Sequence, residues 1–231
     1  MIRVLLALLL APAMAFAQAA PRAGLGASEA REAVDAASPP WSSLVRVQSE
    51  AGGTCTGVLV APDRVLTAAH CLVATRTRAW LRPERVNLLA GYDRGAFRGH
   101  AVALSYVTGA YDPATGGPRG GDWAVLRLAA PLPAPVLPVV AAAPGMEAML
   151  GGWQRDRAHA LLADTACGIE ARRQDTAGPL LIHGCAATRG SSGGPLLVRA
   201  GEGWAVAGVQ VAARGEARGG VAVPADLIPL D

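Results

Sequence analysis

From residue 41 onward, the chain is divided into short β-type runs, and turn residues separate each run from the next. The first series of runs occupies residues 44–47, 56–60, 64–67, 86–89, 101–107 and 123–128. The second series occupies residues 146–153, 179–183, 195–198, 204–211 and 221–223. Many short runs separated by turn signals are typical of β-sandwiches and β-barrels. One segment, 155–163, favours a helix, and otherwise we expect an all-β fold.

A proline-rich stretch separates the two series of runs. Its five prolines stand among alanines and aliphatic residues, at positions 131, 133, 135, 138 and 144. Proline is excluded from central strands and from helix interiors, so we interpret 131–144 as a connector. It divides the chain into an N-terminal half, 41–130, and a C-terminal half, 145–231. The total of 231 residues suffices for one or two domains with a sizeable core.

The first 17 residues have the layout of a secretory signal peptide. Arg3 precedes an apolar run at 4–10, and the small residues Ala15 and Ala17 flank a cleavage point before Gln18. The run is shorter than the roughly 20 residues that a membrane span requires. We therefore expect cleavage after Ala17, export to the periplasm or the medium, and no membrane association after removal of the signal. Residues 18–40 are interpreted as an N-terminal arm or a short propeptide.

Four cysteines are present: Cys55, Cys71, Cys167 and Cys185. An even number in an exported chain predicts two disulfides, and three connectivities are possible. Pairing within each half would close two short loops. The spacing contains no C-x-x-C pair, so a zinc site is not favoured and we predict no metal.

Composition excludes several kinds of chemistry. All 21 basic residues are arginine, so reactions that need a lysine amine are excluded, among them Schiff-base and Ser-Lys chemistry. Asn87 is the only asparagine, which disfavours a Cys-His-Asn triad. A formal net charge of +3 is too small to indicate a nucleic-acid partner. We predict no cofactor and a monomer.

Three short segments combine residues that can act together in nucleophilic catalysis. His70 follows two alanines and precedes Cys71, Asp122 opens an apolar run, and Ser192 stands among glycines. A serine hydroxyl needs a base to become nucleophilic, and the base needs an orienting acid. Each segment alone also fits a packed histidine, a turn aspartate or a plain loop. Together they follow the chain order His…Asp…Ser of one known triad arrangement.

Other acids and histidines lack such a setting. The alternative acids Asp112 and Asp175 do not open an apolar strand as Asp122 does. The remaining histidines have no partner pattern and are expected to be surface or structural; they are His100, His159 and His183.

The wording TAAHC at 67–71, DWAVLRL at 122–128 and GSSGGP at 190–195 resembles the catalytic motifs of the chymotrypsin/trypsin-like serine peptidases. The resemblance extends from residue 40 to about residue 223. Cys55 lies 15 residues before His70, where that family places the disulfide partner of the cysteine after the histidine.

The resemblance implies two packed antiparallel β-barrels with the active site in the cleft between them. The barrels would correspond to the two halves of the chain. It assigns the base to His70, the orienting acid to Asp122 and the nucleophile to Ser192. The backbone N–H groups of Gly190 and Ser192 would form the oxyanion hole.

The chain departs from the animal-type members of that family. Those members carry an aspartate before the nucleophile, which pairs with a new N-terminus after zymogen cleavage, whereas this chain has Ser191. The wording Gly-Ser-Ser-Gly is more similar to bacterial V8-like glutamyl endopeptidases. The arm 26–41, with Arg31 and Val34, is also similar to theirs. Activation through an N-terminal salt bridge is therefore not expected.

The same resemblance places the pocket for a substrate side chain just before the nucleophile and on strand 208–212. Its residues are Ala186, Ala187, Thr188, Arg189 and Gln210. None is acidic, which disfavours cleavage after arginine or lysine, because a buried unpaired cation is costly. Gln210 and Ala187 stand where V8-like members carry a histidine and a threonine. We therefore expect a preference for small or apolar side chains, although Arg189 could attract an acidic one.

The sequence thus predicts an exported serine endopeptidase that hydrolyses polypeptides through a covalent acyl-enzyme. Two alternatives remain, a catalytically silent binding protein and an esterase that uses the same triad.

Overall fold

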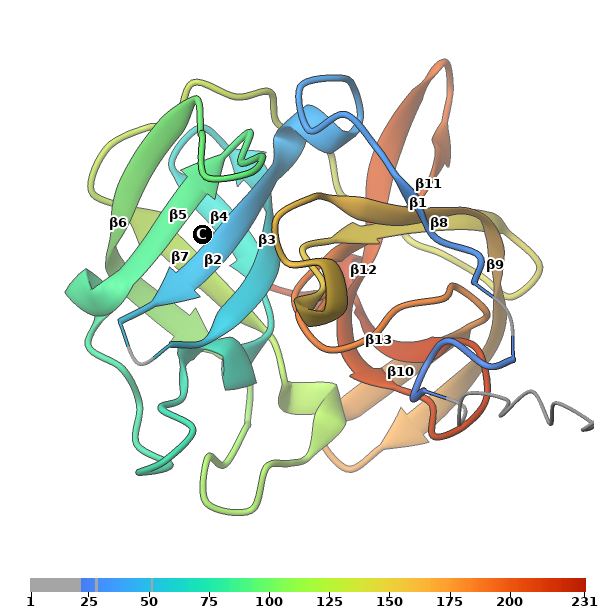
Figure 1. The fold of residues 1–231 in the computed structure, drawn as a ribbon. Helices are drawn as coiled ribbons and strands as arrows, with labels where there is room; N and C mark the ends of the chain where they lie inside the picture. The colour runs from blue at the N-terminus through green and yellow to red at the C-terminus, as the bar shows by residue number, and fades with distance from the viewer. Residues whose placement is uncertain (1–21, 28, 51) are drawn as a thin grey trace, which may run out of the picture.

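The computed structural model describes residues 22–27, 29–50 and 52–231. These residues form two six-stranded antiparallel β-barrels, which lie side by side in Figure 1. The described residues contain no α-helix, only short 3-10 turns. The prediction of an all-β fold with two barrels is confirmed. The predicted signal peptide, 1–17, lies outside the described residues.

The first barrel is closed, in the strand order β2-β3-β4-β7-β6-β5. Its strands are β2 (Leu44–Ser49), β3 (Thr54–Ala61), β4 (Arg64–Thr67), β5 (Val86–Ala90), β6 (Gly99–Thr108) and β7 (Ala124–Leu128). Along β5, every second residue is buried. This alternation places one face of the strand in the barrel core, as the sequence pattern requires.

The second barrel has the strand order β9-β10-β13-β12-β11-β8 and is closed by pairing of β8 with β9. Its strands are β8 (Glu147–Gly152), β9 (Leu162–Asp175), β10 (Gly178–His183), β11 (Pro195–Ala200), β12 (Gly203–Ala213) and β13 (Gly220–Pro224). Five of these strands are nearly or wholly buried in their central residues.

Six single 3-10 turns punctuate the strands. They are η1 (Trp41–Ser43), η2 (Ala69–Leu72), η3 (Pro83–Arg85), η4 (Arg119–Gly121), η5 (Arg155–Arg157) and η6 (Ala225–Leu227). The expected helix at 155–163 is wrong, because only η5 is helical there and β9 already begins at Leu162. The apolar residues of the stretch lie at its end, where Leu161 and Leu162 are buried in the second barrel instead of lining a helix face.

A hydrophobic cluster with members from both barrels joins them. Trp41, Leu44 and Leu66 contribute from the N-terminal side, and Trp153 and Leu197 from the C-terminal side. The indole of Trp153 is fully buried and donates a hydrogen bond to the carbonyl of Tyr92 at 3.1 Å. Burial of this cluster fixes the two barrels against each other, because separating them would expose its apolar surface to water.

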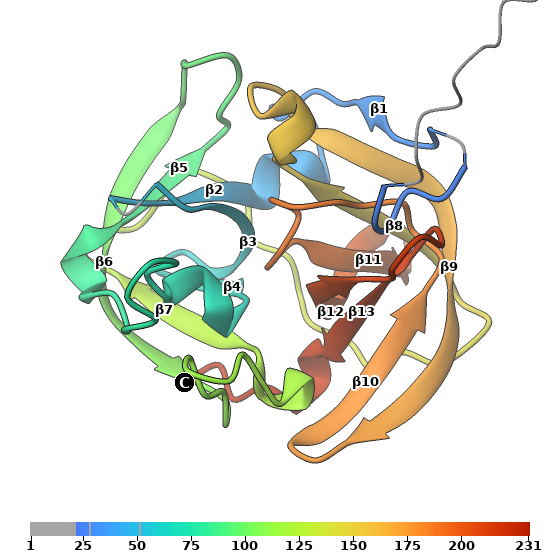
Figure 2. The same cartoon turned by 60° about the horizontal axis from the view of Figure 1, so that its bottom comes forward.

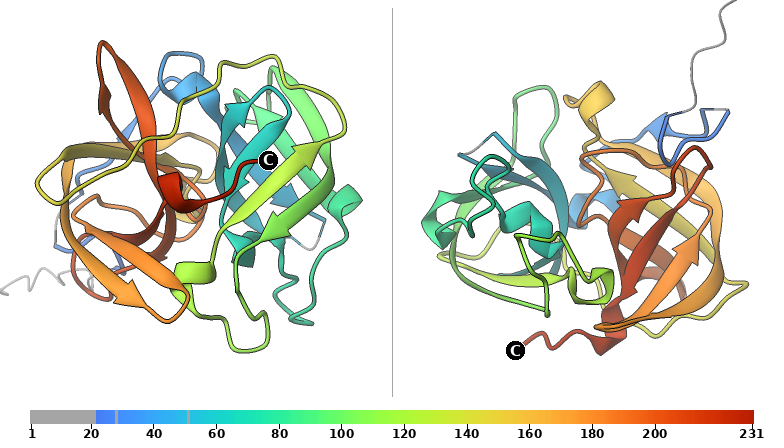
Figure 3. Two further views of the ribbon diagram at one scale, coloured as in Figure 1. Left: turned by 180° about the vertical axis from the view of Figure 1, so that it is seen from behind. Right: turned by 90° about the horizontal axis from the view of Figure 1, so that it is seen from below.

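Two segments outside the strands, the connector and the C-terminal tail, also hold the halves together. The connector crosses behind the barrels (Figure 3), and Leu137 donates a backbone hydrogen bond to Leu59 of the first barrel. Farther along, Val139 forms a bridge with Val206 of β12. The C-terminal tail returns to the first barrel after η6 (Figures 1 and 3).

The N-terminal arm lies against the second barrel, as Figure 2 shows. Its short strand β1 (Glu32–Ala33) pairs with β9, and the N–H of Val34 donates to the carbonyl of Leu161 at 3.0 Å.

Among the described residues, no helix combines the length and the apolarity needed to cross a bilayer.

Candidate active site

His70 lies in η2, the turn that follows β4. The two alanines before it, Ala68 and Ala69, are completely buried, so larger side chains would not fit there. The disulfide between Cys55 and Cys71 ties η2 to β3. The predicted pairing within each half is confirmed, because Cys167 and Cys185 form the second disulfide.

Asp122 follows η4 and holds His70 through both carboxylate oxygens. Oδ1 accepts the backbone N–H of His70 at 2.9 Å, and Oδ2 lies 2.7 Å from Nδ1. The Asp122 side chain is only 6% exposed, whereas that of His70 is 29% exposed. A carboxylate can only accept, so Nδ1 carries the proton and Nε2 is left as the ring acceptor. Asp122 thereby fixes the orientation of the His70 ring.

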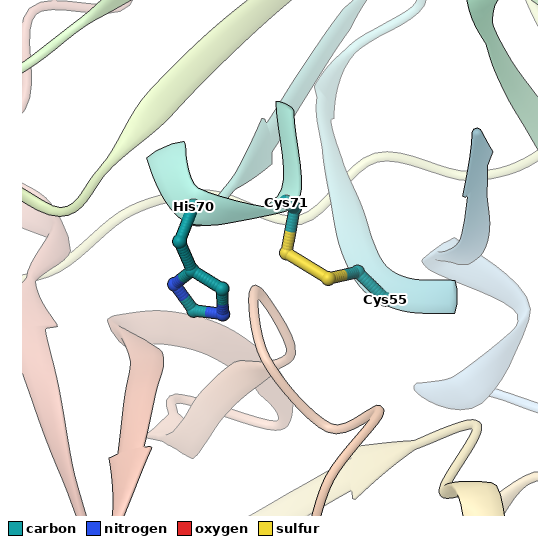
Figure 4. A group of neighbouring side chains, drawn as sticks. All are labelled: Cys55, His70 and Cys71. Carbon is teal, nitrogen blue, oxygen red and sulfur yellow. A yellow bond between two sulfur atoms is a disulfide. The ribbon is translucent and has the colours of Figure 1, made fainter. Parts of the chain in front are cut away.

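The side chains of Cys55, His70 and Cys71 also gather closely enough to suggest a metal site (Figure 4). Their potential ligand atoms lie within 4.8 Å of one another. The two sulfur atoms are joined in a disulfide, so neither is available as a thiolate ligand. Nδ1 of His70 is bonded to Asp122, which leaves the cluster with too few donors for a metal ion.

The alternative acids have other roles. Asp112 accepts hydrogen bonds from Ala114 and Thr115 in its own loop. Asp175 accepts the backbone N–H of Gly120 at 2.7 Å. Of the three candidate acids, Asp122 is thus the one in contact with His70.

Ser192 is partly exposed on a tight loop that packs against the first barrel. The carbonyl of Ser192 accepts the N–H of Thr56 at 2.8 Å, and the hydroxyl of Thr56 donates to the carbonyl of Gly190 at 3.0 Å. Gly193 has φ +79, and a Cβ there would overlap Thr67 and the carbonyl of Thr56. Only glycine allows the loop to approach the first barrel so closely.

The turn before Ser192 directs a backbone N–H toward the open side. The carbonyl of Arg189 accepts the N–H of Arg155 at 2.8 Å. In a trans peptide the N–H of the next residue, Gly190, points the opposite way. Gly190 has φ +102 and lines a cavity, and a Cβ there would overlap the carbonyl of Trp153. This geometry makes the Gly190 N–H available to an oxyanion.

Both barrels contribute to this cavity, which has a volume of about 640 Å³. His70, Asp122 and Ser192 all line it. Among the described residues that line the cavity, Asp122 is the single carboxylate. Four exposed arginines also line the cavity; they are Arg78, Arg119, Arg155 and Arg189. None of these four forms an ion pair with a carboxylate of the described residues. The cavity is therefore lined with positive charge.

The residues predicted for the substrate side-chain pocket occupy different environments. Arg189 lines the cavity, together with Val211 and Ala212 of β12. The other four predicted members do not line the cavity. Thr188 is partly buried, and the remaining three are buried; they are Ala186, Ala187 and Gln210.

Sequence reasoning did not find the partner of His183. This histidine is fully buried, and its Nε2 lies 2.6 Å from Oε1 of Gln210. Its Nδ1 accepts the N–H of Cys185 at 3.2 Å, so Nε2 carries the proton and donates to Gln210. Burial lowers the pKa of His183 to about 4, which keeps the ring neutral at physiological pH. His100 and His159 are exposed, as expected.

Three other residues that shape the site have no marker in the sequence. Thr56 and Gln154 are completely buried and bond the turn that precedes Ser192. Arg31 was noted only for its place in the arm, yet its side chain is completely buried. Its burial cannot be recognised from sequence alone, because two of its partners, Gln154 and Asp156, lie far along the chain.

The family model described as Trypsin matches residues 29–229. A solved structure of a Glu endopeptidase in complex with MPD shares 20% identity and a TM-score of 0.71, and the match covers 87% of this chain and 94% of that one. The Vibrio cholerae VesB protease shares 17% identity and a TM-score of 0.66, over 88% of this chain and 64% of that one. No curated protein matches the sequence.

At these identities the two structures support the fold alone, which agrees with the pair of six-stranded barrels. The family model spans most of the chain, from the arm to the C-terminal tail. The protein therefore belongs to the trypsin family of serine peptidases.

Proposed function

We propose that the protein is a serine endopeptidase whose catalytic residues are His70, Asp122 and Ser192. The observation that carries the proposal is the pair of hydrogen bonds from His70 to Asp122, on the wall of a cavity that Ser192 also lines. A base held by a buried acid, on the wall of a cavity that an accessible hydroxyl also lines, fits the arrangement that nucleophilic catalysis needs.

The reaction follows from these positions. The hydroxyl of Ser192 attacks the carbonyl carbon of the scissile peptide bond, and its proton passes to Nε2 of His70. The resulting imidazolium is stabilised by Asp122. The imidazolium then gives its proton to the departing amine, which leaves an ester on Ser192. A water molecule, deprotonated by His70, hydrolyses this ester and restores the free hydroxyl.

The oxyanion that forms on the attacked carbonyl is assigned to the N–H groups of Gly190 and Ser192. Both groups belong to a turn that is fixed by hydrogen bonds from Thr56 and Arg155. Removal of one such donor typically costs about 3–4 kcal/mol of transition-state stabilisation.

The surroundings of the cavity support a substrate class. Arg189 at the wall disfavours a cationic side chain at the scissile residue, and the uncharged walls Val211 and Ala212 favour a small or apolar one. The other arginines around the cavity would attract acidic side chains that flank the scissile bond. Because exposed charges are screened by salt, this preference should weaken as ionic strength rises.

We also propose export, which is supported by the signal-like layout of residues 1–17 and by two disulfides. Disulfides are typical of the periplasm and the extracellular medium. N-terminal sequencing of protein recovered from these fractions should begin at Gln18, and recovery of the uncleaved chain from the cytoplasm would contradict the proposal.

The test of the function has two parts. An organophosphate probe should label Ser192 in the wild type and fail to label Ser192→Ala, which distinguishes an enzyme from a silent binding protein. A digest of a peptide library should then yield cleaved peptides. Cleavage of activated esters without any cleavage of peptides would favour the esterase alternative.

A further inference from the structure

The segment before β1 passes between two loops of the second barrel. The carbonyl of Gly24 accepts the N–H of Gly219 at 3.0 Å and that of Ala187 at 3.3 Å. The N–H of Gly24 donates to the carbonyl of Arg214 at 2.7 Å. A Cβ at Gly24 would overlap the carbonyl of Ala187, and φ is +81, so glycine is required. The arm is therefore bonded to the second barrel at Ala187, immediately before the turn that leads to Ser192.

A second attachment of the arm is a buried arginine. The Arg31 side chain is 0% exposed, and its Nη2 lies 2.7 Å from Oε2 of Glu29 and 2.8 Å from Oδ2 of Asp156. Burial opposes the charge of Arg31, but the hydrogen bonds to these two carboxylates outweigh it and raise its pKa. The bond from Arg31 lowers the pKa of Glu29 to about 2. The cluster thus stays charged at neutral pH.

The same arginine reaches the turn before Ser192 through Gln154. Oε1 of Gln154 accepts from Nη1 of Arg31 at 2.6 Å and from the backbone N–H of Thr188 at 2.8 Å. Two donors converge on this oxygen, so the amide cannot be reversed. Nε2 of Gln154 is buried and has no partner among the described residues. An unpaired buried N–H is destabilising, so it is the oxygen of Gln154 that this position uses.

Thr188 is the residue on which the turn closes. The carbonyl of Thr188 accepts both the N–H of Ser191 at 3.1 Å and its hydroxyl at 2.7 Å. The next peptide, Arg189–Gly190, is held by the N–H of Arg155. Gln154 and Arg155 are adjacent in the chain, and both bond the turn that presents the Gly190 N–H. Arg31 in turn holds Gln154 in place through its hydrogen bond to Oε1.

We propose that Arg31 and Gln154 are positioning residues for the oxyanion hole, and that the arm 22–34 is a permanent part of the mature protein. The proposal rests on the proposed peptidase function, because it assigns these residues to stabilisation of the transition state. Any processing of the chain would then end before Arg22.

Four variants test the proposal in the full-length protein. Gln154→Leu removes the acceptor oxygen, and Arg31→Gln removes the charged brace. Gln154→Glu keeps an oxygen for both donors and serves as the conservative rescue. Glu32→Ala is the matched control, because it removes an exposed arm contact to Thr165 that does not lead to the turn.

The readouts separate positioning from folding. We expect Arg31→Gln and Gln154→Leu to lower kcat by about 10–100-fold, somewhat less than complete loss of one oxyanion donor. KM should change less than about twofold, and the inhibition constant of a peptide aldehyde, which forms an oxyanion on Ser192, should rise in parallel with the fall in kcat. Gln154→Glu should retain a clearly larger kcat than Gln154→Leu, and Glu32→Ala should have the wild-type kcat. Thermal unfolding gives the folded fraction of each variant.

Four results would overturn the proposal. The first is equal loss of activity in Gln154→Glu and Gln154→Leu. The second is a loss that the unfolded fraction explains. The third is a rise in KM with an unchanged aldehyde constant. The fourth is a fully active protein whose sequenced N-terminus lies within or beyond the arm 22–34. The rate of organophosphate labelling of Ser192 is compared across the same variants. This rate measures the positioning role even if no peptide is cleaved. Absence of peptide cleavage would refute the proposed peptidase function but not the positioning role.

Discussion

The two barrels build their shares of the candidate site in different ways. The first barrel supplies His70 and Asp122, and the bonds between them lie wholly within it, close to its own disulfide at Cys71. The turn that carries Ser192 belongs to the second barrel, yet Thr56 of the first barrel bonds it.

The N-terminal arm also bonds that turn, through Gln154. The contact between His70 and Asp122 is therefore a property of one barrel. The turn that carries Gly190 and Ser192, the proposed oxyanion hole and nucleophile, is fixed only in the assembled molecule, because its supports come from three separate parts of the chain.

The most severe way to break the comparison is to remove the contribution of the second barrel. Ser192→Ala should reduce kcat by about 10⁶-fold, because loss of a triad nucleophile abolishes the covalent route. Ser191→Ala should retain most of the activity, since it removes one hydrogen bond to Thr188. Peptide hydrolysis by both purified variants measures the difference, and the reverse order would reassign the nucleophile.

The contribution of the first barrel is tested by Asp122→Asn. The amide can donate to Nδ1 of His70 and so favours the wrong tautomer, which should lower kcat by about 10⁴-fold. The matched variant Asp112→Asn alters an exposed loop carboxylate and should leave kcat unchanged. A loss below tenfold for Asp122→Asn would remove this residue from the mechanism.

The two disulfides compare the barrels directly. They span similar separations, 16 residues for Cys55–Cys71 and 18 for Cys167–Cys185. Replacement of either pair by alanines should lower the free energy of unfolding by about 3 kcal/mol, because loop closure depends only weakly on length.

The two disulfide replacements should differ in kcat, although they lower the free energy of unfolding by similar amounts. Removal of Cys55–Cys71 frees the turn that carries His70, so kcat of the folded protein should fall more than after removal of Cys167–Cys185. Urea unfolding and kcat at a temperature where both variants are folded provide the measurement. Equal kcat values would show that the turn is fixed without its disulfide.

The last prediction concerns stability at acidic pH, and it rests on His183, the buried histidine of the second barrel. Its pKa is lowered from 6.5 to about 4 by burial. Between pH 6.5 and pH 4, His183 is protonated in the unfolded chain but remains neutral in the folded protein. The free energy of unfolding therefore falls as the pH drops toward 4. This contribution of His183 is on the order of 3 kcal/mol in total.

Urea unfolding of wild type and His183→Asn between pH 7 and pH 4 isolates this term. The difference between the two curves should slope with pH, whereas His100→Gln, at an exposed histidine, should reproduce the wild-type slope. A parallel pair of curves for wild type and His183→Asn would place the acid sensitivity elsewhere.

The strand pattern and the proline-rich connector were enough to predict an all-β molecule in two halves, because short runs between turn residues have few other solutions. The helix expected at 155–163 failed for a local reason, since Leu161 and Leu162 are buried in the second barrel and Asp156 is bonded by the arm. The importance of Arg31 could not be foreseen, because two of its three partners, Gln154 and Asp156, become its neighbours only after folding.

By itself, the sequence determined which residues carry reactive groups and in what order along the chain, because motifs are local and composition excludes the competing chemistry. Only the tertiary structure decided which groups meet. Asp122 reaches His70 across 52 positions, and Arg31 reaches Gln154 across 123. Hydrogen bonds act over about 3 Å, and such distances between remote residues are set by barrel closure and core packing rather than by any local pattern.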